Sequence, residues 1–222
     1  DYIRYGFLNK YLTRTVTITP GVDEGRFIQD ASIKTEYPSI LFVAGLGKSE
    51  QYKGLNLLID SMLEIKKTVP NIVLNVVGDG DMRETYEQRV EQLHMEDSIK
   101  FWGRLNGPKL VEKYQKSHLL VSASTNESFS MVILEAMSSS MPVIAFDVGS
   151  TAQMIENGKN GFLRSCISDH ELTNKITKLL TNKELALTFG RLGRERVLER
   201  FTWKTKINEY EQVLKEVLSN RK

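Results

Sequence analysis

The stretch ILFVAGLGKSEQYKGLNLLIDSML, residues 40–63, contains three kinds of segment in succession. The apolar run at 40–45 has the length and the β-branched content of a buried strand. A loop with three glycines follows at 45–54, and apolar residues then recur at helical spacing, at Leu55, Leu58, Ile59, Met62 and Leu63. The stretch therefore predicts a strand, a glycine-rich loop and a helix.

The same alternation continues along the chain. Further apolar runs of strand length are IVLNVVG at 72–78, SIKFWG at 98–103, LLVSAS at 119–124 and PVIAF at 142–146, with helical patterns between them. Near-continuous apolar strands separated by helices are typical of a parallel sheet that is buried on both faces. We predict an α/β fold with a Rossmann-like, doubly wound parallel sheet.

In such sheets ligands bind at the carboxyl ends of the strands, and glycines stand at that position here. They follow four of the five predicted strands, at Gly45, Gly47, Gly78, Gly80, Gly103 and Gly149. Glycine allows a tight turn and a close approach of the backbone to a ligand, although any single one could be ordinary loop punctuation. The cluster therefore indicates a ligand site.

Two common phosphate-binding motifs do not fit these loops. Gly-Lys-Ser at 47–49 lacks the earlier glycine of a triphosphatase P-loop, because position 42 is Phe42. Neither GLGKSE nor GDGDMR completes the G-x-G-x-x-G fingerprint, since they end in Glu50 and Arg83. A triphosphatase is set aside and a nicotinamide dehydrogenase is disfavoured.

The composition is typical of an ordinary soluble globular protein. The chain has 222 residues, of which 41% are hydrophobic and 26% charged, and its net charge of +2 does not favour nucleic-acid binding. The pI of about 8.5 suits anionic substrates or weak peripheral contact with the inner face of a membrane. With one cysteine, Cys166, no secretory signal and no long apolar run, we expect a cytoplasmic protein.

The segment NESFSMVILEAMSSSMPVIAF at 126–146 carries two informative glutamates. From Met131 to Met137 every residue except Glu135 is apolar, which predicts a buried helix. A carboxylate there needs partners, and the vicinal hydroxyls of a ribose would satisfy it. Glu127 falls in the loop entering this helix, where backbone N–H groups and the helix dipole attract anions. The alternative is that a glutamate here only caps a core helix.

ESFSMVILEAMSSSMPVIAFDVGS resembles the Glu-x7-Glu signature of retaining glycosyltransferases of the GT-B fold, family four, which use sugar-nucleotide donors. Further blocks resemble that family in the same order: ITPGVDEGRF, GLGKSEQYKG, VVGDGDMRETYE, IKFWGRL, HLLVSAS, ENGKNGFL and FTWKTKINEYEQVL. Together they span about residues 15–215. The resemblance implies a domain that binds a nucleoside-diphosphate sugar and transfers its glycosyl group with retention of configuration.

The resemblance assigns the donor diphosphate to one set of positions. Lys53 would neutralise the diphosphate at the loop that holds Gly47 and Lys48. The backbone amides of Ser130 and Met131 would assist from the entrance of the glutamate-bearing helix.

The sugar and nucleoside fall to a second set of positions. Glu127 would meet the donor sugar and is expected to be catalytic, and Glu135 would hold the ribose diol. Gly78 is expected at the donor site, and Arg104 with Leu105 would contact the base through the backbone. Such donors would stabilise the charge that develops on the departing nucleoside diphosphate.

The chain departs from the family pattern at three places. Leu46 stands near the place of a common arginine that pairs with the lysine, and Lys48 is the candidate substitute, although a lysine lacks the bidentate fork. Ser130 replaces a usual glycine and leaves the backbone donor intact. Ser150 with Gln153 replaces a frequent Gly…Glu pattern.

The resemblance covers only the donor half of a two-domain enzyme. We expect residues 1–30 to contain the end of a missing N-terminal domain and the linker, and residues 31–200 to form the donor-binding domain. Residues 201–222 are expected to be a helix that leans toward the missing half, with its aromatic residues mainly in the core. An acceptor, which would be a sugar, a lipid or a protein, would bind through the missing domain.

We expect neither a metal nor another cofactor. Asp79-Gly80-Asp81 spells an Asp-x-Asp, but it precedes a predicted helix, where aspartates favour the N-cap and first turn. The histidines lie far apart, at His94, His118 and His170. Two other functions stay open: a non-catalytic nucleotide-sugar-binding subunit and a sugar-nucleotide epimerase of similar fold. The base, with UDP and GDP as the main candidates, and the sugar are not fixed by the sequence.

Overall fold

The computed structural model describes residues 15–30, 34–164 and 169–219, so Cys166 and the expectation for residues 1–14 lie outside it. The first half contains β1 (Ser39–Val43), the 3-10 helix η3 (Lys48–Lys53), α1 (Leu55–Thr68), β2 (Val73–Val77), α2 (Arg83–Gln92), β3 (Ile99–Phe101) and α3 (Gly107–Lys116). The second half contains β4 (Leu119–Ser122), α4 (Met131–Ser138), β5 (Val143–Phe146), α5 (Thr151–Met154), β6 (Phe162–Arg164), α6 (Asp169–Thr181), α7 (Lys183–Arg200) and α8 (Trp203–Ser219).

The strands form one parallel sheet in the order β3-β2-β1-β4-β5-β6. This confirms the predicted doubly wound, Rossmann-like α/β fold. Strand β6 was not among the predicted strands, because its sequence, FLR, has only two consecutive apolar residues and gives no apolar run or alternation. The strand order reverses between β1 and β4, which is the place where sheets of this kind bind ligands.

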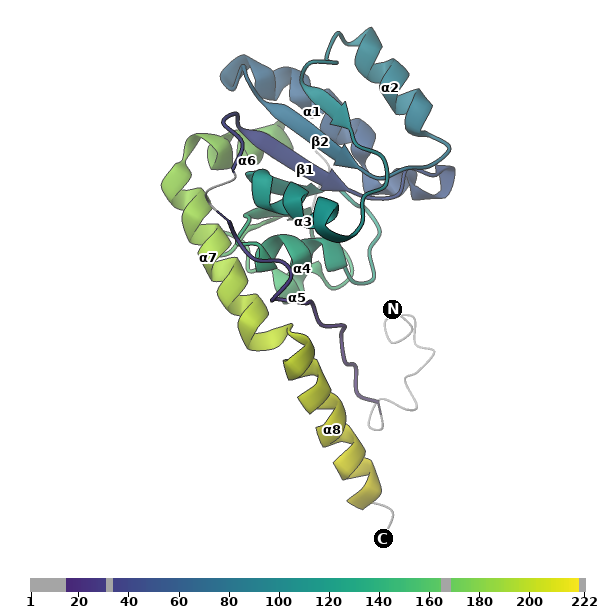
Figure 1. Cartoon of the computed structure of the whole chain (residues 1–222), viewed down its shortest axis with the longest axis vertical. Coiled ribbons are helices and arrows are strands. Elements are labelled where there is room, and N and C mark those ends of the chain that lie inside the picture. The colour runs from purple at the N-terminus through teal and green to yellow at the C-terminus, as the bar shows by residue number, and fades with distance from the viewer. Residues whose placement is uncertain (1–14, 31–33, 165–168, 220–222) are drawn as a thin grey trace.

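Alternate residues of each central strand enter two different cores. Ile40 and Phe42 of β1 pack with α1, α2 and α6, whereas Leu41 between them packs with α3, α4 and α7. Strands β4 and β5 divide in the same way. The sheet is therefore covered on both faces, as Figure 1 shows. Each fully buried aliphatic side chain contributes on the order of 1.5–3 kcal/mol to this packing.

Helix α8 extends away from the body of the domain (Figure 1). Trp203 and Tyr210 are 50% and 53% exposed, so the expectation that the aromatic residues of this helix lie mainly in the core is wrong for these two. Phe201, just before the helix, is buried. A helix packed on the sheet would have hidden these side chains, but α8 reaches beyond the sheet and meets the body only near its start.

Candidate functional site

Two adjoining hollows lie at the carboxyl edge of the sheet, around the switch point between β1 and β4. They share a wall made by Val43, Ala44 and Val132. The smaller hollow is lined also by Lys53, Ser124, Glu127 and Ser130. The larger one is a cleft of about 450 Å³, lined by Gly45, Glu50, Val77, Gly78, Asp79, Arg104, Leu105 and Asn106. Residues from several loops and helices thus converge on one groove.

The smaller hollow holds an ion pair. Lys53 Nζ lies 2.8 Å from Glu127 Oε2, and the two side chains are 23% and 14% exposed. Lys53 ends η3 after the first strand, and Glu127 precedes α4 after the fourth strand, so the fold brings together residues 74 positions apart. At this degree of burial the attraction is stronger than at an open surface, because less water screens it.

Helix α4 begins beside this pair. Its N-cap is Ser130, whose side chain makes no capping hydrogen bond and which is buried at 4% exposure. The first amides of a helix have no intrahelical acceptor and carry the positive end of the dipole. The helix entrance therefore adds anion-attracting groups, from Ser130 and the half-buried Met131, next to the Lys53 ammonium.

Glycine is required where these loops touch. Gly149 has a φ of +57°, and a Cβ there would stand 1.6 Å from the carbonyl oxygen of Glu127. Gly78 has a φ of +147°, and its Cβ would stand 1.7 Å from the carbonyl oxygen of Ala44. A larger residue at Gly149 would push its loop away from the loop that carries Glu127. A larger residue at Gly78 would push its loop away from the one that follows β1.

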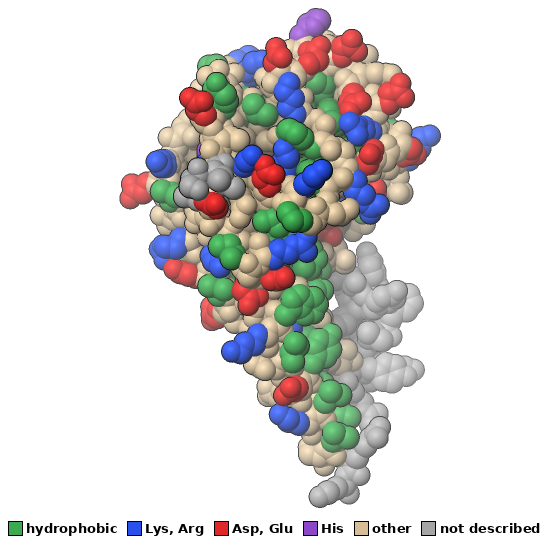
Figure 2. Space-filling view, viewed as in Figure 1, with side chains coloured by type: hydrophobic (Ala, Val, Ile, Leu, Met, Phe, Trp, Pro, Cys, Tyr) green, Lys and Arg blue, Asp and Glu red, His purple; other side chains and the backbone are tan. Residues whose placement is uncertain are grey.

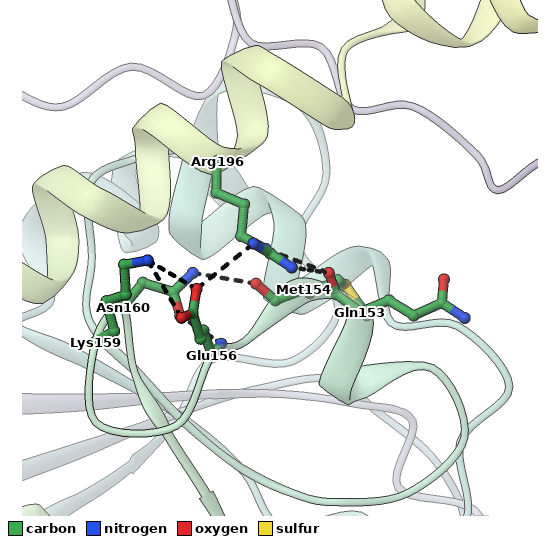
Figure 3. A network of polar contacts seen from close by, with 6 residues as sticks. All are labelled: Gln153, Met154, Glu156, Lys159, Asn160 and Arg196. Carbon is green, nitrogen blue, oxygen red and sulfur yellow. Dashed lines mark hydrogen bonds and ion pairs between the residues drawn. The ribbon is translucent and has the colours of Figure 1, made fainter.

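The loop that carries Glu127 is braced from α7. Ser150 Oγ, just before α5, donates to the carbonyl of Ser128 at 2.6 Å. At the other end of α5, the Arg196 guanidinium of α7 donates to the carbonyl of Gln153 at 2.8 Å from Nη2 (Figure 3). The Asn160 side-chain amide donates a hydrogen bond to the next carbonyl, that of Met154, at 3.1 Å. A chain of contacts thus connects α7 to the site.

Glu135 lies one turn after Val132 on α4, in a different environment from Glu127. Its Oε2 accepts a 2.6 Å hydrogen bond from the hydroxyl of Tyr114. Burial raises the pKa of Glu135, while the Tyr114 hydrogen bond and the charge of Arg26 act in the opposite direction. It is therefore a half-buried carboxylate that already has one donor.

The 45–54 loop is held by carboxylates of its own and of its neighbour. Glu50 Oε2 accepts from the amide of Gly47 at 3.2 Å, and Asp81 Oδ1 accepts from the amide of Lys48 at 2.8 Å. The prediction that Asp79 and Asp81 cap the following helix is wrong. The N-cap of α2 is Met82 without a side-chain bond, and Asp79 instead accepts from the amide of Gly80.

The structure brings most of the predicted site residues together. Lys53, Glu127 and Ser130 line the small hollow, with Met131 at its helix, and Gly78, Arg104 and Leu105 line the cleft. Gly47 lies in the adjoining loop, where its amide bonds Glu50. Lys48 is exposed and lines neither hollow, so the predicted substitute for the missing arginine stays untested. Sequence reasoning missed Glu50, Asn106 and Tyr114, which no local pattern distinguishes from other helix and loop residues.

The described residues also bear on metals and membranes. Over the described ranges, no group of three or more His, Cys, Asp or Glu side chains is arranged to hold a metal ion. None of the helices within those ranges has both the length and the apolar character that a bilayer span requires.

Similarity to known proteins extends over most of the chain. It is 28% identical over 216 residues to an uncharacterised glycosyltransferase of Methanocaldococcus jannaschii, covering 97% of this chain and 58% of that protein. It is 33% identical over 149 residues to N-acetyl-alpha-D-glucosaminyl L-malate synthase of Bacillus anthracis, covering 67% of this chain and 39% of that protein. The chain thus spans about half the length of these relatives.

A solved structure, Anabaena HepE in complex with UDP, superposes with a TM-score of 0.81 at 24% identity, over 91% of this chain and 57% of that one. This likeness supports the fold. The model of the family described as glycosyl transferases group 1 matches residues 23–196, which is most of the described domain. The chain therefore belongs to the glycosyl transferases group 1 family.

Proposed function

We propose that this domain binds a nucleoside-diphosphate sugar at the carboxyl edge of the sheet and, with a second domain, transfers the glycosyl group to an acceptor with retention. The observation that carries the proposal is the pairing of Lys53 with Glu127 beside the entrance of α4, in a hollow that shares a wall with the cleft. A cation and free helix amides suit a diphosphate, and the carboxylate suits the hydroxyls of a sugar.

The ligand would lie over the small hollow, whose volume is only about 20 Å³, and extend along the cleft. The diphosphate would lie between Lys53 and the amides at Ser130 and Met131, with the sugar toward Glu127. The nucleoside would extend along the cleft, with its ribose toward Glu135 and its base near Leu105. This order follows from the shared wall at Val132, because Glu135 lies one helical turn beyond it on the same face of α4.

The chemistry then rests on charge. As the bond between the sugar and the diphosphate breaks, negative charge grows on the departing diphosphate. Lys53 and the helix amides are fixed before the reaction, so they stabilise that charge without reorganising. Glu127 would hold the sugar while positive character develops on it. No metal is assigned to this step.

Names of similar proteins support the class of donor. Anabaena HepE was solved with UDP, and the Bacillus anthracis relative is named for an N-acetylglucosaminyl group. UDP-sugars are therefore the first donors to test, with GDP- and ADP-sugars as alternatives.

Calorimetric titration with UDP, GDP and ADP and their glucose conjugates, with and without EDTA, tests the proposal. At least one diphosphate should bind, and EDTA should leave its affinity unchanged. Loss of binding in EDTA would contradict the metal-free assignment. Conversion of the donor to another sugar without an acceptor would favour an epimerase, and binding without transfer in the two-domain protein would favour a non-catalytic subunit.

The second domain is proposed to pack on one face of α8. Its exposed apolar side chains recur at heptad-like spacing, at Trp203, Ile207, Tyr210, Leu214, Val217 and Leu218. Figure 2 shows hydrophobic side chains along this helix. A stripe of this extent is typical of a surface that another unit covers, and the relatives are about twice as long as this chain.

Charge on this face tests the arrangement. In a protein that carries both domains, Ile207→Glu with Leu214→Glu should reduce turnover at least tenfold and leave diphosphate binding unchanged, because a buried unpaired carboxylate is costly. Gln212→Glu adds charge to the opposite side of α8 and serves as the control. Equal turnover for the double variant and this control would contradict the proposed packing.

A further inference from the structure

Tyr114 is a fully buried tyrosine whose hydroxyl is directed at the Glu135 carboxylate. It lies on α3 with 0% exposure, and its hydroxyl donates to Glu135 Oε2 on α4 at 2.6 Å. Its ring packs edge-to-face against Phe27, with centroids 5.4 Å apart and an interplanar angle of 88°. Both the ring and the hydroxyl are therefore fixed by neighbours.

Few neighbouring groups act on the charge and the orientation of the Glu135 carboxylate. The groups that act on it are Tyr114 from α3 and the charge of Arg26 from the segment before the sheet. Burial raises the pKa of Glu135, and both of these groups oppose that rise. Burial and the charge of Glu135 together raise the pKa of Tyr114 well above its ordinary value, so the phenol stays a donor.

Helix α3 links this pair to the cleft. The turn that enters α3 contributes Arg104, Leu105 and Asn106 to the cleft wall, and Tyr114 lies two turns further along the helix. The opposite wall carries Val132, one turn before Glu135. The turn before α3 and the first turn of α4 therefore line the cleft, and the same two helices hold the hydrogen bond further along.

We propose that Tyr114 is a positioning residue that orients the Glu135 carboxylate to grip the ribose diol. The inference rests on the proposed function, because it presupposes that a ribose lies at Glu135. With Oε2 held by the phenol, the plane of the carboxylate is fixed and Oε1 remains for the sugar hydroxyls. A carboxylate held in this way loses less rotational freedom on binding than a free one.

The inference predicts selectivity for ribose over deoxyribose. An acceptor-only carboxylate binds two hydroxyl donors well, whereas a ligand without the 2′-hydroxyl leaves part of it unsatisfied. Tyr114→Phe removes the orienting bond and keeps the ring. We expect this variant to bind UDP roughly five- to twentyfold more weakly and 2′-deoxy-UDP almost as well as the wild type does.

The pH profile gives a readout that a merely structural role would not change. Ionised Glu135 accepts bonds from the diol, so UDP affinity should fall as the pH drops through the pKa of this residue. Tyr114→Phe removes a group that lowers that pKa, so the loss of affinity should begin at a higher pH in the variant. Carbon-13 NMR titration of the Glu135 carboxyl would report the same upward shift without ligand.

The experiment measures UDP and 2′-deoxy-UDP affinities by calorimetry for the wild type, Tyr114→Phe, Glu135→Gln and Tyr86→Phe. Tyr86 is another buried tyrosine, on α2 with 3% exposure, and controls for the loss of a buried hydroxyl. The UDP preference should fall in Tyr114→Phe, nearly vanish in Glu135→Gln and persist in Tyr86→Phe. Melting temperatures check that each variant is folded.

The outcomes separate the two claims. If Glu135→Gln loses the preference while Tyr114→Phe keeps it with a wild-type pH profile, the inference is overturned and the proposed function stands. If Glu135→Gln keeps the preference, the ribose assignment itself is wrong. If the wild type does not bind UDP, the same comparison is made with GDP and 2′-deoxy-GDP and with ADP and 2′-deoxy-ADP. Failure of all three would overturn the proposed function and the inference together.

Discussion

The two edges of the sheet hold hollows of similar size but are built in opposite ways. The cleft at the carboxyl edge measures about 450 Å³, and a cavity of about 420 Å³ at the amino edge is lined by Lys34, Pro38, His118, Pro142 and residues of α6 and α7. At the amino edge, Lys34 donates to the carbonyl of Ser117, and Ser39 Oγ lies 3.0 Å from His118 Nδ1. Lys34 and His118 there thus contact polar groups within the amino edge itself.

The carboxyl edge instead pairs charged groups from different loops. Glycines with positive φ bring loop backbones together, and Lys53 pairs with Glu127, a partner that the proposed diphosphate would replace. Volume therefore does not single out the proposed donor site in this molecule. The proposal rests instead on backbone conformation and on the placement of charge.

The largest effect is expected from a substitution that disrupts the backbone at the carboxyl edge. Gly149→Ala would combine the αL strain of a residue at φ +57° with a clash against the Glu127 carbonyl, so we expect about 3 kcal/mol or more of lost stability by urea denaturation. Gly158→Ala is the matched control, because Gly158 has a φ of +79° but a Cβ there would meet nothing within 4 Å. It should cost about 1 kcal/mol, and equal losses would show that the loops do not need this approach.

Lys53 and Lys34 lie at the two edges of the sheet, so replacing each in turn compares the edges directly. Lys53→Met should weaken UDP binding by roughly ten- to a hundredfold, because a charged hydrogen bond is worth about 1.5–3 kcal/mol, and should leave uridine binding unchanged. Lys34→Met at the amino edge should leave both affinities unchanged. Calorimetry decides, and equal losses of UDP and uridine affinity for Lys53→Met would remove this lysine from the diphosphate.

Removing the exchangeable partner should produce a gain. In Glu127→Gln the Lys53 ammonium is no longer held by a carboxylate, and the negative charge near the diphosphate disappears. We expect UDP to bind roughly two- to fivefold tighter, since a partly exposed ion pair is worth up to about 1 kcal/mol. Glu209→Gln, which removes the partner of Lys206 on α8 and lies in neither hollow, is the control. Weaker UDP binding in Glu127→Gln would mean that the carboxylate supports the diphosphate site.

The last prediction concerns the pH dependence of stability at the amino edge. Burial, with the charge of Lys34, lowers the pKa of His118 from 6.5 to about 4, so the folded state favours the neutral ring. The stability that this residue contributes is complete above pH 6.5 and declines as the pH falls toward 4. His118→Asn should flatten the decline in unfolding free energy between these pH values. A decline as steep as in the wild type would assign the acid sensitivity to other groups.

The sequence predicted what local patterns encode. Five strands, the buried helix around Glu135 and the convergence of Lys53 with Glu127 followed from apolar runs, glycines and the Glu-x7-Glu resemblance. Contacts that depend on tertiary packing did not follow. Tyr114 meets Glu135 only because α3 and α4 pack on the same face of the sheet, and no spacing between positions 114 and 135 signals it.

The errors have similar causes. The aspartates of 79–81 were expected to cap the nearest helix, but the tight turn gives Asp81 a closer donor in the 45–54 loop, the amide of Lys48. The aromatic residues of α8 were expected in a core, because a sequence pattern does not show whether a helix lies on the domain or extends past it. Both errors arise because a local pattern does not show which contacts a segment makes with residues distant in sequence.

The strand order has a consequence for how the domain folds. Strand β1 pairs with β2, about thirty residues later (Ser39 with Val73), but also with β4, where Ile40 meets Leu119. The pairing of β1 with β4 closes a much longer loop than the pairing with β2. Closing the longer loop costs more chain entropy and slows folding. The candidate site lies at this late junction, so we expect each half of the sheet to become protected from hydrogen exchange before the chain gains any affinity for a nucleotide. Recovery of binding during refolding would then time the meeting of the two halves.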